Sequence, residues 1–241
     1  LKRFRQSVLA AACSGELTRE WRDANFGISN ATIRLPKLAN SRRKLWESRQ
    51  LSGGRTRRYP ERYTASAPYE LPEAWCWTSV SQMALLDVGF AFKSSDFSET
   101  GIRLLRGENV EPGGLRWKET RCLPENKLDR ERHMLVEEGD IILGMDRPLV
   151  SAGLKIARVR KSDMPALLVQ RVMRFKMVDP ADADFLYYCL AERRFIDFLA
   201  HEGMTGSDLP HITGTGVAEF PIPLPPLEEQ AEIVRQVNRL F

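Results

Sequence analysis

Nucleophiles and glycine pairs in this sequence stand outside the motifs that catalysis and nucleotide binding require. Gly214-Thr-Gly216 is followed by Glu219, where a dinucleotide-binding fingerprint needs a third glycine. A glycine-rich phosphate loop ending in Lys-Ser or Lys-Thr is absent from the sequence, as is an Asn-Pro-Pro-Tyr-like methyltransferase motif. Ser151, Ser207 and Cys189 lack the sequence context of an activated nucleophile. The sequence therefore favours a protein that binds over one that catalyses.

Carboxylates and thiols are scattered in the same way. Asp140 and Glu138 flank a predicted strand, as nuclease carboxylates do, but no Glu-x-Lys element follows them, so we interpret both as turn-forming acids. The four cysteines, separated by 63, 46 and 67 residues, form no Cys-x-x-Cys pair, and the histidines lie far from them. This spacing argues against a zinc site and is typical of reduced thiols in a cytoplasmic protein. We expect no metal and no cofactor in this chain.

Polar side chains beside predicted strand ends are the remaining source of chemistry. Arginine can read guanine, Asn and Gln can read adenine, and all of them can hold a phosphate. The candidates are Arg103, Arg106, Asn109, Arg116 with Trp117, Arg147, Lys155, Gln170, Arg171 and Arg174. His211 is a further candidate for a phosphate or base contact, against the alternative of a structural loop histidine. Each cation taken singly is also explained as a solvated surface charge, so the group suggests nucleic-acid binding and leaves both interpretations open.

Composition and charge narrow the class of protein. The chain has 241 residues, of which 43% are hydrophobic and 28% charged, which permits a sizeable core and argues against disorder. The sequence holds neither an apolar run of about 20 residues nor a secretory signal pattern, and we expect a cytoplasmic protein. Residues 1–63 carry 15 Lys and Arg against five Asp and Glu, whereas the remainder carries 21 against 27. Such asymmetry suggests that the basic end faces a polyanion or an acidic partner, although residues 40–63 also fit a solvated linker.

Amphipathic helices are predicted at both ends of the chain. Their apolar positions are Leu1, Phe4, Val8 and Ala11 in the first, and Leu227, Ile233, Val237 and Leu240 in the second. Ser14-Gly15 ends the first helix, and Pro226 can occupy the first turn of the second. Because neither helix is long enough to be stable alone in water, each apolar stripe must be covered, and we expect the opposite helix to cover it, apart from the globule.

A mixed α and β globule is predicted between these helices, preceded by a basic, irregular arm. The expected strands cover residues 79–88, 102–105, 133–137, 141–145, 154–159 and 167–178, and residues 137–140 are expected to join two of them in a hairpin. Asp179-Pro180 is expected to cap a helix that ends near Gly203. Its apolar face would be formed by Phe185, Cys189, Phe195 and Leu199. The predicted fold class is α+β, with a β-rich globule flanked by coiled-coil-like helices.

Several motifs, in order, resemble the specificity subunits of type I restriction–modification systems. Residues 1–18 with Trp21 are similar to the end of that family's conserved spacer helix, and Leu71-Pro-Glu-Ala-Trp-Cys-Trp77 resembles the entry to its target-recognition domain. Residues 101–110, 138–147 and 168–171 look like internal blocks of that domain, and residues 223–234 look like the start of the next conserved helix. Only residues 22–69 lack a counterpart.

The resemblance implies a non-catalytic subunit that reads double-stranded DNA. In this family each of two recognition domains reads half of a split sequence. Long antiparallel helices separate the domains and dock methyltransferase subunits, on which S-adenosylmethionine is expected, so the resemblance implies that the two end helices pair antiparallel. Restriction subunits then translocate and cleave DNA. The implied division is spacer-helix end 1–15, basic arm 16–69, recognition domain 70–220 and distal helix 221–241, so we expect part of a longer protein. The implied subunit interface comprises Leu1, Phe4, Val8, Leu227, Ile233 and Val237.

Two alternatives remain at this stage. The chain is also compatible with the recognition end of a longer, single-chain restriction–methylation enzyme. It is further compatible with a helical adaptor whose globule binds protein. Duplex binding separates the adaptor from the other two, and the residues upstream of Leu1 separate the specificity subunit from the enzyme.

Overall fold

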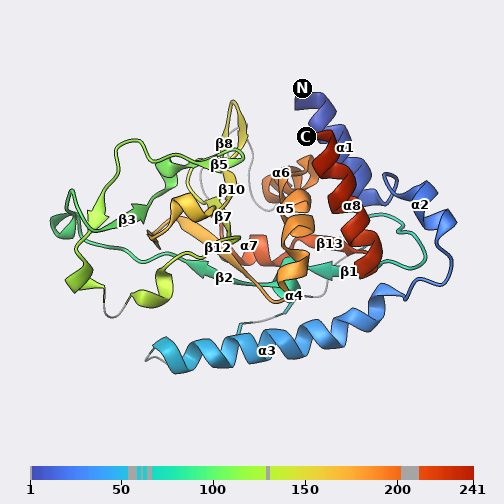
Figure 1. Ribbon diagram of the computed structural model, residues 1–241, viewed down its shortest axis with the longest axis horizontal. Helices are drawn as coiled ribbons and strands as arrows, with labels where there is room; N and C mark the ends of the chain where they lie inside the picture. The colour runs from blue at the N-terminus through green and yellow to red at the C-terminus, as the bar shows by residue number, and fades with distance from the viewer. Residues whose placement is uncertain (1, 54–58, 61, 64–66, 129–130, 202–211) are drawn as a thin grey trace.

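One central sheet joins a β-rich end of the molecule to a helical end (Figure 1). The computed structural model describes residues 2–53, 59–60, 62–63, 67–128, 131–201 and 212–241. The helices are α1 Lys2–Ser14, α2 Arg19–Ala24, α3 Arg34–Gly53, α4 Val80–Met83, α5 Ala183–Ala191, α6 Arg193–His201, α7 Gly214–Glu219 and α8 Leu227–Leu240. The strands are β1 Cys76–Ser79, β2 Ala84–Val88, β3 Ile102–Leu105, β4 Val110–Glu111, β5 Gly114–Leu115, β6 Cys122–Leu123, β7 Ile141–Gly144, β8 Leu149–Val150, β9 Gly153–Leu154, β10 Ile156–Arg158, β11 Ala166–Leu168, β12 Val172–Met177 and β13 Pro221–Leu224. This mixture confirms the predicted α+β class.

The central sheet has four antiparallel strands in the order β10-β7-β12-β2. A second sheet, β11-β3-β6, lies beyond it, with β11 and β3 parallel. A bridge between Phe90 and Val169 links the strands of the two sheets. At the helical end, β1 pairs with the proline-rich β13, from Cys76 opposite Leu224 to Ser79 opposite Pro221. Proline is compatible with such a two-stranded pair because an outward-facing position needs no N–H donor.

Alternation along the central strands divides the interior into two cores. Met173 and Phe175 face the helices and share a core with Phe185 and Ile233, whereas Val172 lies in a second core with the strands of the other sheet. The period of two is the one that the sequence predicts for residues 173–177. The sheet therefore carries apolar side chains on both faces.

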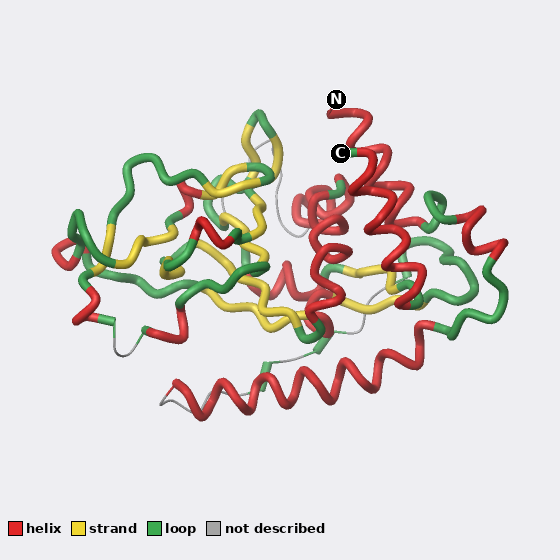
Figure 2. The backbone as a smooth tube through the Cα atoms, in the orientation of Figure 1, coloured by secondary structure: helices red, strands yellow, loops and turns green. Residues whose placement is uncertain are grey.

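The end helices α1 and α8 lie side by side and antiparallel, with both chain ends at the same end of the pair (Figures 1 and 2). The predicted antiparallel pairing is thus confirmed. Both helices also pack on α5, and Val8, Ile233 and Val237 belong to the same core as Phe175 of the central sheet. The expectation that the pair lies apart from the globule is therefore wrong, because α5 supplies an apolar face that covers both helices.

The prediction of an irregular arm is wrong for residues 34–53, which form the 20-residue helix α3 (Figure 2). Its sequence has weak apolar periodicity, so hydrophobic pattern alone does not reveal it. Leu38 is buried in the main core, and ionic and aromatic contacts hold the rest of the helix. The Arg42 guanidinium lies 4.7 Å from the centre of the Tyr59 ring, and Arg49 pairs with Asp87 of β2 at 2.6 Å.

Other predicted strands are interrupted. Residues 79–88 contain the short helix α4, and 154–159 divide into β9 and β10. The run 167–178 breaks at 169–171 into β11 and β12. The predicted hairpin over 133–145 is wrong: a 3-10 turn covers Arg132–Met134, and Leu135 bridges to Leu167 of β11 instead of pairing with β7. The carbonyls of His133 and Leu135 also accept hydrogen bonds from Arg174.

The helix expected from residue 179 onward begins as predicted and is divided in two. The Asp179 carboxylate accepts a hydrogen bond from the Ala181 N–H, and the chain passes through a 3-10 turn, Pro180–Asp182, into α5. Glu192, whose backbone is extended, separates α5 from α6. The four predicted apolar positions are all buried, whereas Gly203 lies outside the described residues.

Candidate nucleic-acid interface

The ends of five strands meet at one end of the central sheet, on the side of the β-rich part. β2 and β7 finish there and β10 and β12 begin there, because neighbouring strands of the central sheet are antiparallel. β11 also finishes there, since residues 169–171 turn from β11 directly into β12. Loops that are far apart in the sequence are therefore neighbours at this end of the sheet.

Four of the predicted base- or phosphate-binding side chains belong to these loops. The Met145 N–H donates to the Arg171 carbonyl at 2.9 Å, and the Gln170 N–H donates to the Phe90 carbonyl at 2.9 Å. The third residue after β7 and the residue before β10 complete a group that we name the sheet-end cluster: Arg147, Lys155, Gln170 and Arg171. Its cationic and amide donors suit both phosphates and base edges.

Backbone conformation sets two members of this cluster apart. Among the described residues, Glu119, Arg147 and Arg171 are the non-glycine residues with positive φ, and the two arginines have φ of 41° and 64°. A left-handed conformation costs a residue with a Cβ about 1 kcal/mol or more. Such strain is concentrated at turns and binding sites. Both turns carry their arginine out of the sheet into solvent.

An acidic neighbour orients Arg171. Its guanidinium pairs with the Asp146 carboxylate at 2.5 Å, and 65% of the Arg171 side chain is exposed. An ion pair this exposed contributes at most about 1 kcal/mol to stability, because water screens it. Its main consequence is geometric: Asp146 restricts the directions in which Arg171 can point.

Three other predicted arginines are held by their own protein. Arg103 donates to the carbonyls of Ser162 and Met164, both at 3.0 Å, and its guanidinium lies 4.3 Å from the centre of the Trp117 ring. Arg106 donates to the Glu119 carbonyl at 3.0 Å and also pairs with Glu108. Arg116 pairs with Glu111 at 2.7 Å, with both side chains exposed. Contacts from Arg103 and Arg106 to DNA would require these bonds to be exchanged.

Asn109 and Arg174 are corrections to the predicted list. Asn109 is buried, its Oδ1 accepts from the Arg106 N–H, and its Nδ2 donates to the Arg116 carbonyl. Arg174 is only 2% exposed and pairs with Asp87 at 2.7 Å beneath α3. Both side chains stabilise the fold, so neither is available to read a base.

The ion pairs of Arg174 also explain the pKa shifts of two carboxylates, Asp87 and Asp140. Burial alone would raise the pKa of Asp87, but Arg174 and Arg49 hold that pKa below its ordinary value. Burial raises the pKa of Asp140, and Arg174 offsets this only in part. The Asp140 carboxylate accepts a hydrogen bond from the Glu137 N–H, which confirms its interpretation as a turn-forming acid. Within the described ranges, groups of three or more His, Cys, Asp or Glu placed to hold a metal ion are absent.

Three of the six predicted subunit-interface residues are buried inside this chain. Val8, Ile233 and Val237 are buried in the main core, which corrects their assignment to a partner contact. Phe4 and Leu227 remain exposed, and Leu1 lies outside the described residues, as does His211 of the nucleic-acid list. Exposed apolar side chains therefore persist on α1 and α8, at opposite ends of the antiparallel pair.

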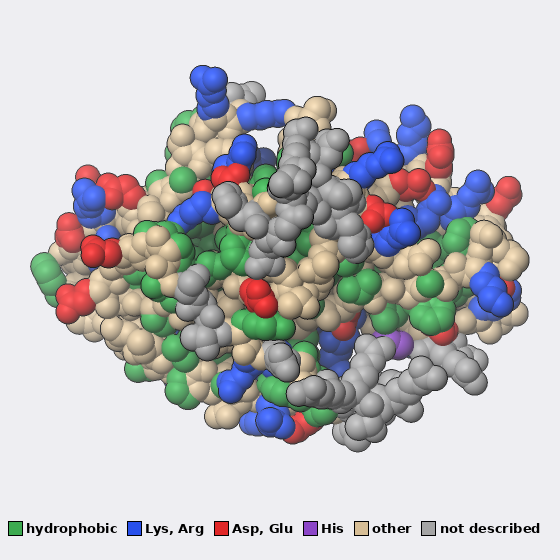
Figure 3. All heavy atoms as spheres, turned by 180° about the vertical axis from the view of Figure 1, so that it is seen from behind, with side chains coloured by type: hydrophobic (Ala, Val, Ile, Leu, Met, Phe, Trp, Pro, Cys, Tyr) green, Lys and Arg blue, Asp and Glu red, His purple; other side chains and the backbone are tan. Residues whose placement is uncertain are grey.

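Several arginines of the basic arm likewise bind groups of this same chain. Arg34 pairs with Asp182 and donates to the Pro225 carbonyl at 3.0 Å, and Arg42 and Arg49 are bound as described above. On the face shown in Figure 3, cationic and anionic side chains are interspersed. The described side chains on that face therefore do not form an uninterrupted basic surface.

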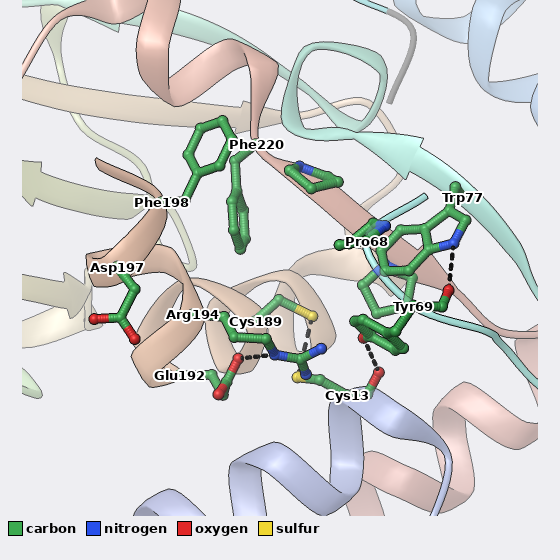
Figure 4. A pocket seen from close by; sticks show the side chains of 12 residues that line it. Cys13, Pro68, Tyr69, Trp77, Cys189, Glu192, Arg194, Asp197, Phe198 and Phe220 are labelled. Atoms are coloured by element: carbon green, nitrogen blue, oxygen red, sulfur yellow. Dashed lines mark hydrogen bonds and ion pairs between the residues drawn. The ribbon is translucent and has the colours of Figure 1, made fainter. Parts of the chain in front are cut away.

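An apolar cavity of about 260 Å³ lies at the helical end, lined by Tyr69, Trp77, Phe198 and Phe220 (Figure 4). Its floor holds the thiols of Cys13 and Cys189, whose sulfurs are 3.4 Å apart. Burial raises the pKa of Cys189, which keeps it a thiol. The polar groups around the cavity bind one another: the Tyr69 hydroxyl donates to the Cys13 carbonyl and Arg194 pairs with Glu192. This cavity differs in character from the sheet-end cluster.

Sequence reasoning missed the apolar and acidic neighbours of the cluster. Val88, Phe90, Leu149 and Val150 are exposed at this end of the sheet. Their exposure cannot be read from a pattern, because apolar residues in short strands are expected to be buried. The adjacency of Asp146 to a predicted Arg was the one signal available.

Comparisons with known proteins agree on one family. A family model described as "Type I restriction modification DNA specificity domain" matches residues 103–241. The chain is 30% identical over 99% of its length to the type I restriction enzyme EcoAI specificity subunit of Escherichia coli, covering 39% of that protein. It is 34% identical over 71% of its length to the MjaVIII specificity subunit of Methanocaldococcus jannaschii, covering 41% of it. The chain thus spans about two fifths of the length of these relatives.

Solved structures show the same fold. The HsdS subunit from Thermoanaerobacter tengcongensis aligns with a TM-score of 0.51 at 15% identity, covering 98% of this chain and 50% of that one. A chain from a structure described as showing complex assembly and conformational transition of the type I R-M system aligns with a TM-score of 0.54 at 16% identity, covering 87% and 48%. In the part of the chain that the structure describes, helices long and apolar enough to cross a membrane are absent.

Proposed function

The chain belongs to the family of type I restriction modification DNA specificity domains, and from this premise we propose that it recognises a specific double-stranded DNA sequence. Its role would be to direct methylation and restriction that partner subunits perform. The observation that carries the proposal is the convergence of four side chains at one end of the central sheet, namely Arg147, Lys155, Gln170 and Arg171. Four donors from three loops form a surface that matches the acceptor-rich edges and phosphates of DNA.

The remaining parts of the proposal follow from the family. Methyltransferase subunits and a restriction subunit would assemble with the longer protein, and S-adenosylmethionine would bind to the methyltransferase rather than to this chain. The chain itself would be non-catalytic and act in the cytoplasm. The exposed side chains of Phe4 and Leu227 support a subunit contact on α1 and α8.

Selection from a pool of random-sequence duplexes tests the proposal directly. Duplexes retained by the chain at low salt should converge on one motif, and affinity for that motif should fall steeply as salt rises, because phosphate contacts release counterions. Retained duplexes without a shared motif would contradict sequence recognition, and affinity independent of salt would contradict phosphate contacts.

A second test addresses the non-catalytic role. The purified chain, incubated with the selected duplex, magnesium and S-adenosylmethionine, should leave the DNA uncut and unmethylated. Stoichiometric binding of S-adenosylmethionine to the chain alone would contradict this part of the proposal.

A further inference from the structure

The hairpin β8–β9 projects from the central sheet beside the sheet-end cluster (Figure 1, the yellow arch at the top of the view). Leu149 pairs with Leu154 and Val150 pairs with Gly153, and residues 151–152 form the tip. Leu154 is buried and fixes the base of the hairpin, where the Lys155 N–H donates to the Pro148 carbonyl at 2.7 Å. A two-stranded ribbon of this kind fits the width of the DNA major groove.

The hairpin exposes apolar side chains where water would favour polar ones. Leu149 is 39% exposed and Val150 is 37% exposed. Val150 lies opposite Gly153, which has no side chain to cover it. Because successive side chains of a strand point to opposite faces, the ribbon presents one apolar group on each side. Nothing in the fold requires these two positions to be apolar, since neither belongs to a core.

Cations surround this apolar ribbon. Arg147 precedes β8 and Lys155 follows β9, and the Lys2 ammonium donates to the Ser151 carbonyl at the tip, at 2.7 Å. An apolar element flanked by positive charge is complementary to a polyanion that also offers an apolar group. In the DNA major groove that group is the C5 methyl of thymine, which distinguishes A·T from G·C pairs.

We propose that the β8–β9 hairpin enters the major groove and that Leu149 and Val150 read thymine methyl groups. The inference rests on the proposed function and adds a chemical specificity to it: at least one target position contacted by the hairpin is an A·T pair. Burying one methyl group corresponds to about a fourfold change in affinity.

Deoxyuridine tests this contact at the level of a single methyl group, since it pairs like thymine and lacks only the methyl. The selected target duplex is prepared with thymine or with deoxyuridine throughout. The unaltered chain should bind the deoxyuridine duplex about fourfold more weakly for each methyl group contacted. The double variant Leu149→Ser, Val150→Ser removes every methyl group from these two side chains and should bind both duplexes equally. The matched control Arg171→Ala should weaken both and leave their ratio unchanged.

The outcomes separate this inference from the proposed function. A target without thymine, or equal binding of the unaltered chain to both duplexes, overturns the hairpin contact while sequence recognition stands. A double variant that retains the preference for thymine overturns it as well. Failure to select any motif overturns the proposed function itself. Thermal melting of each variant checks that the fold is retained.

Discussion

The sheet end and the helical end of this molecule use the same residue types in different ways. At the helical end, Arg22 pairs with Glu229, whose two oxygens also accept from Thr18 at 2.8 Å and from Trp75 at 2.8 Å. At the sheet end, Arg171 makes one exposed ion pair and Arg147 is exposed. An arginine locates a binding surface only when its donors are not already used inside the protein.

The apolar side chains of the two ends also differ in their burial. Those of α1, α5 and α8 fill a core that reaches the central sheet, whereas Leu149 and Val150 stand on a two-stranded ribbon and belong to neither core. Helices that cover one another bury their apolar faces, whereas this hairpin buries only Leu154 at its base. The predictions below test this division, from the largest expected effect to the smallest.

The largest effect is expected within α8. Ile233→Asp places a charge in the main core and should cost more than about 4 kcal/mol, so that the cooperative melt is lost. Leu240→Asp changes a side chain of the same helix that is 44% exposed and should leave the melting temperature nearly unchanged. If Ile233→Asp also left the melting temperature nearly unchanged, α8 would have to lie apart from the globule.

The buried ion network gives the next largest effect. Asp87→Asn removes the nearer charged partner of buried Arg174, at 2.7 Å, and leaves only Asp140 at 3.6 Å, so it should cost about 3–5 kcal/mol of unfolding free energy. Asp140→Asn should cost less, because burial already raises the pKa of Asp140 and disfavours its charge. Chemical denaturation at pH 7 compares the two variants, and a larger loss for Asp140→Asn would contradict this account.

The same network predicts a pH dependence. The folded-state pKa of Asp87 lies below its unfolded value, so its ionisation stabilises the fold at all pH values above about 4. That contribution is lost as pH falls through the folded-state pKa. Unfolding free energies measured between pH 7 and pH 2 should therefore fall in the unaltered chain, with a shallower acid limb in Asp87→Asn.

A smaller effect should separate two arginines in the β-rich part. Arg171→Ala should weaken binding to the selected duplex by about 1–3 kcal/mol with little change in melting temperature. Arg103→Ala removes two backbone hydrogen bonds and a stacking contact with Trp117, so it should lower the melting temperature. The reverse pattern would move the recognition surface from the sheet end to the Trp117 side.

The smallest effect concerns phosphate contacts. If Lys155 binds a phosphate, Lys155→Gln should weaken binding to all sequences alike and reduce the slope of log affinity against log salt by about one. The exposed pair of Arg116 and Glu111 offers a control, since Arg116→Gln should leave the slope unchanged. Titrations at four salt concentrations distinguish the two.

The sequence predicts those parts of the molecule that local pattern determines. The alternation at residues 173–177, the cap at Asp179 and the apolar face from Phe185 to Leu199 all depend on near neighbours. The helix α3 was missed because, of its described leucines, only Leu38 is buried in the main core, and the helix is otherwise held by Tyr59 and Asp87, contacts that no periodicity reveals. The hairpin over 133–145 was wrong because Leu135 and Val136 pair with β11, which lies further along the chain, instead of with β7.

The candidate site shows the same limit. Residue type alone selected Arg103, Asn109 and Arg171 equally, and only the contacts of each side chain distinguish them. The Asn109 amide is hydrogen-bonded within a turn, and the Arg103 guanidinium donates to two carbonyls. Arg171 is directed outward by its left-handed backbone, and its carbonyl accepts a hydrogen bond from the Met145 N–H. These differences arise from strand order, which sequence spacing does not contain.

The central claim is that the sheet-end cluster carries the sequence preference. The most direct measurement is the ratio of affinities for the selected duplex and a scrambled duplex, in the unaltered chain and in the double variant Arg147→Gln, Arg171→Gln. We expect the ratio to fall at least tenfold in the double variant, with an unchanged melting temperature. A ratio that stays the same in a folded double variant would contradict the claim.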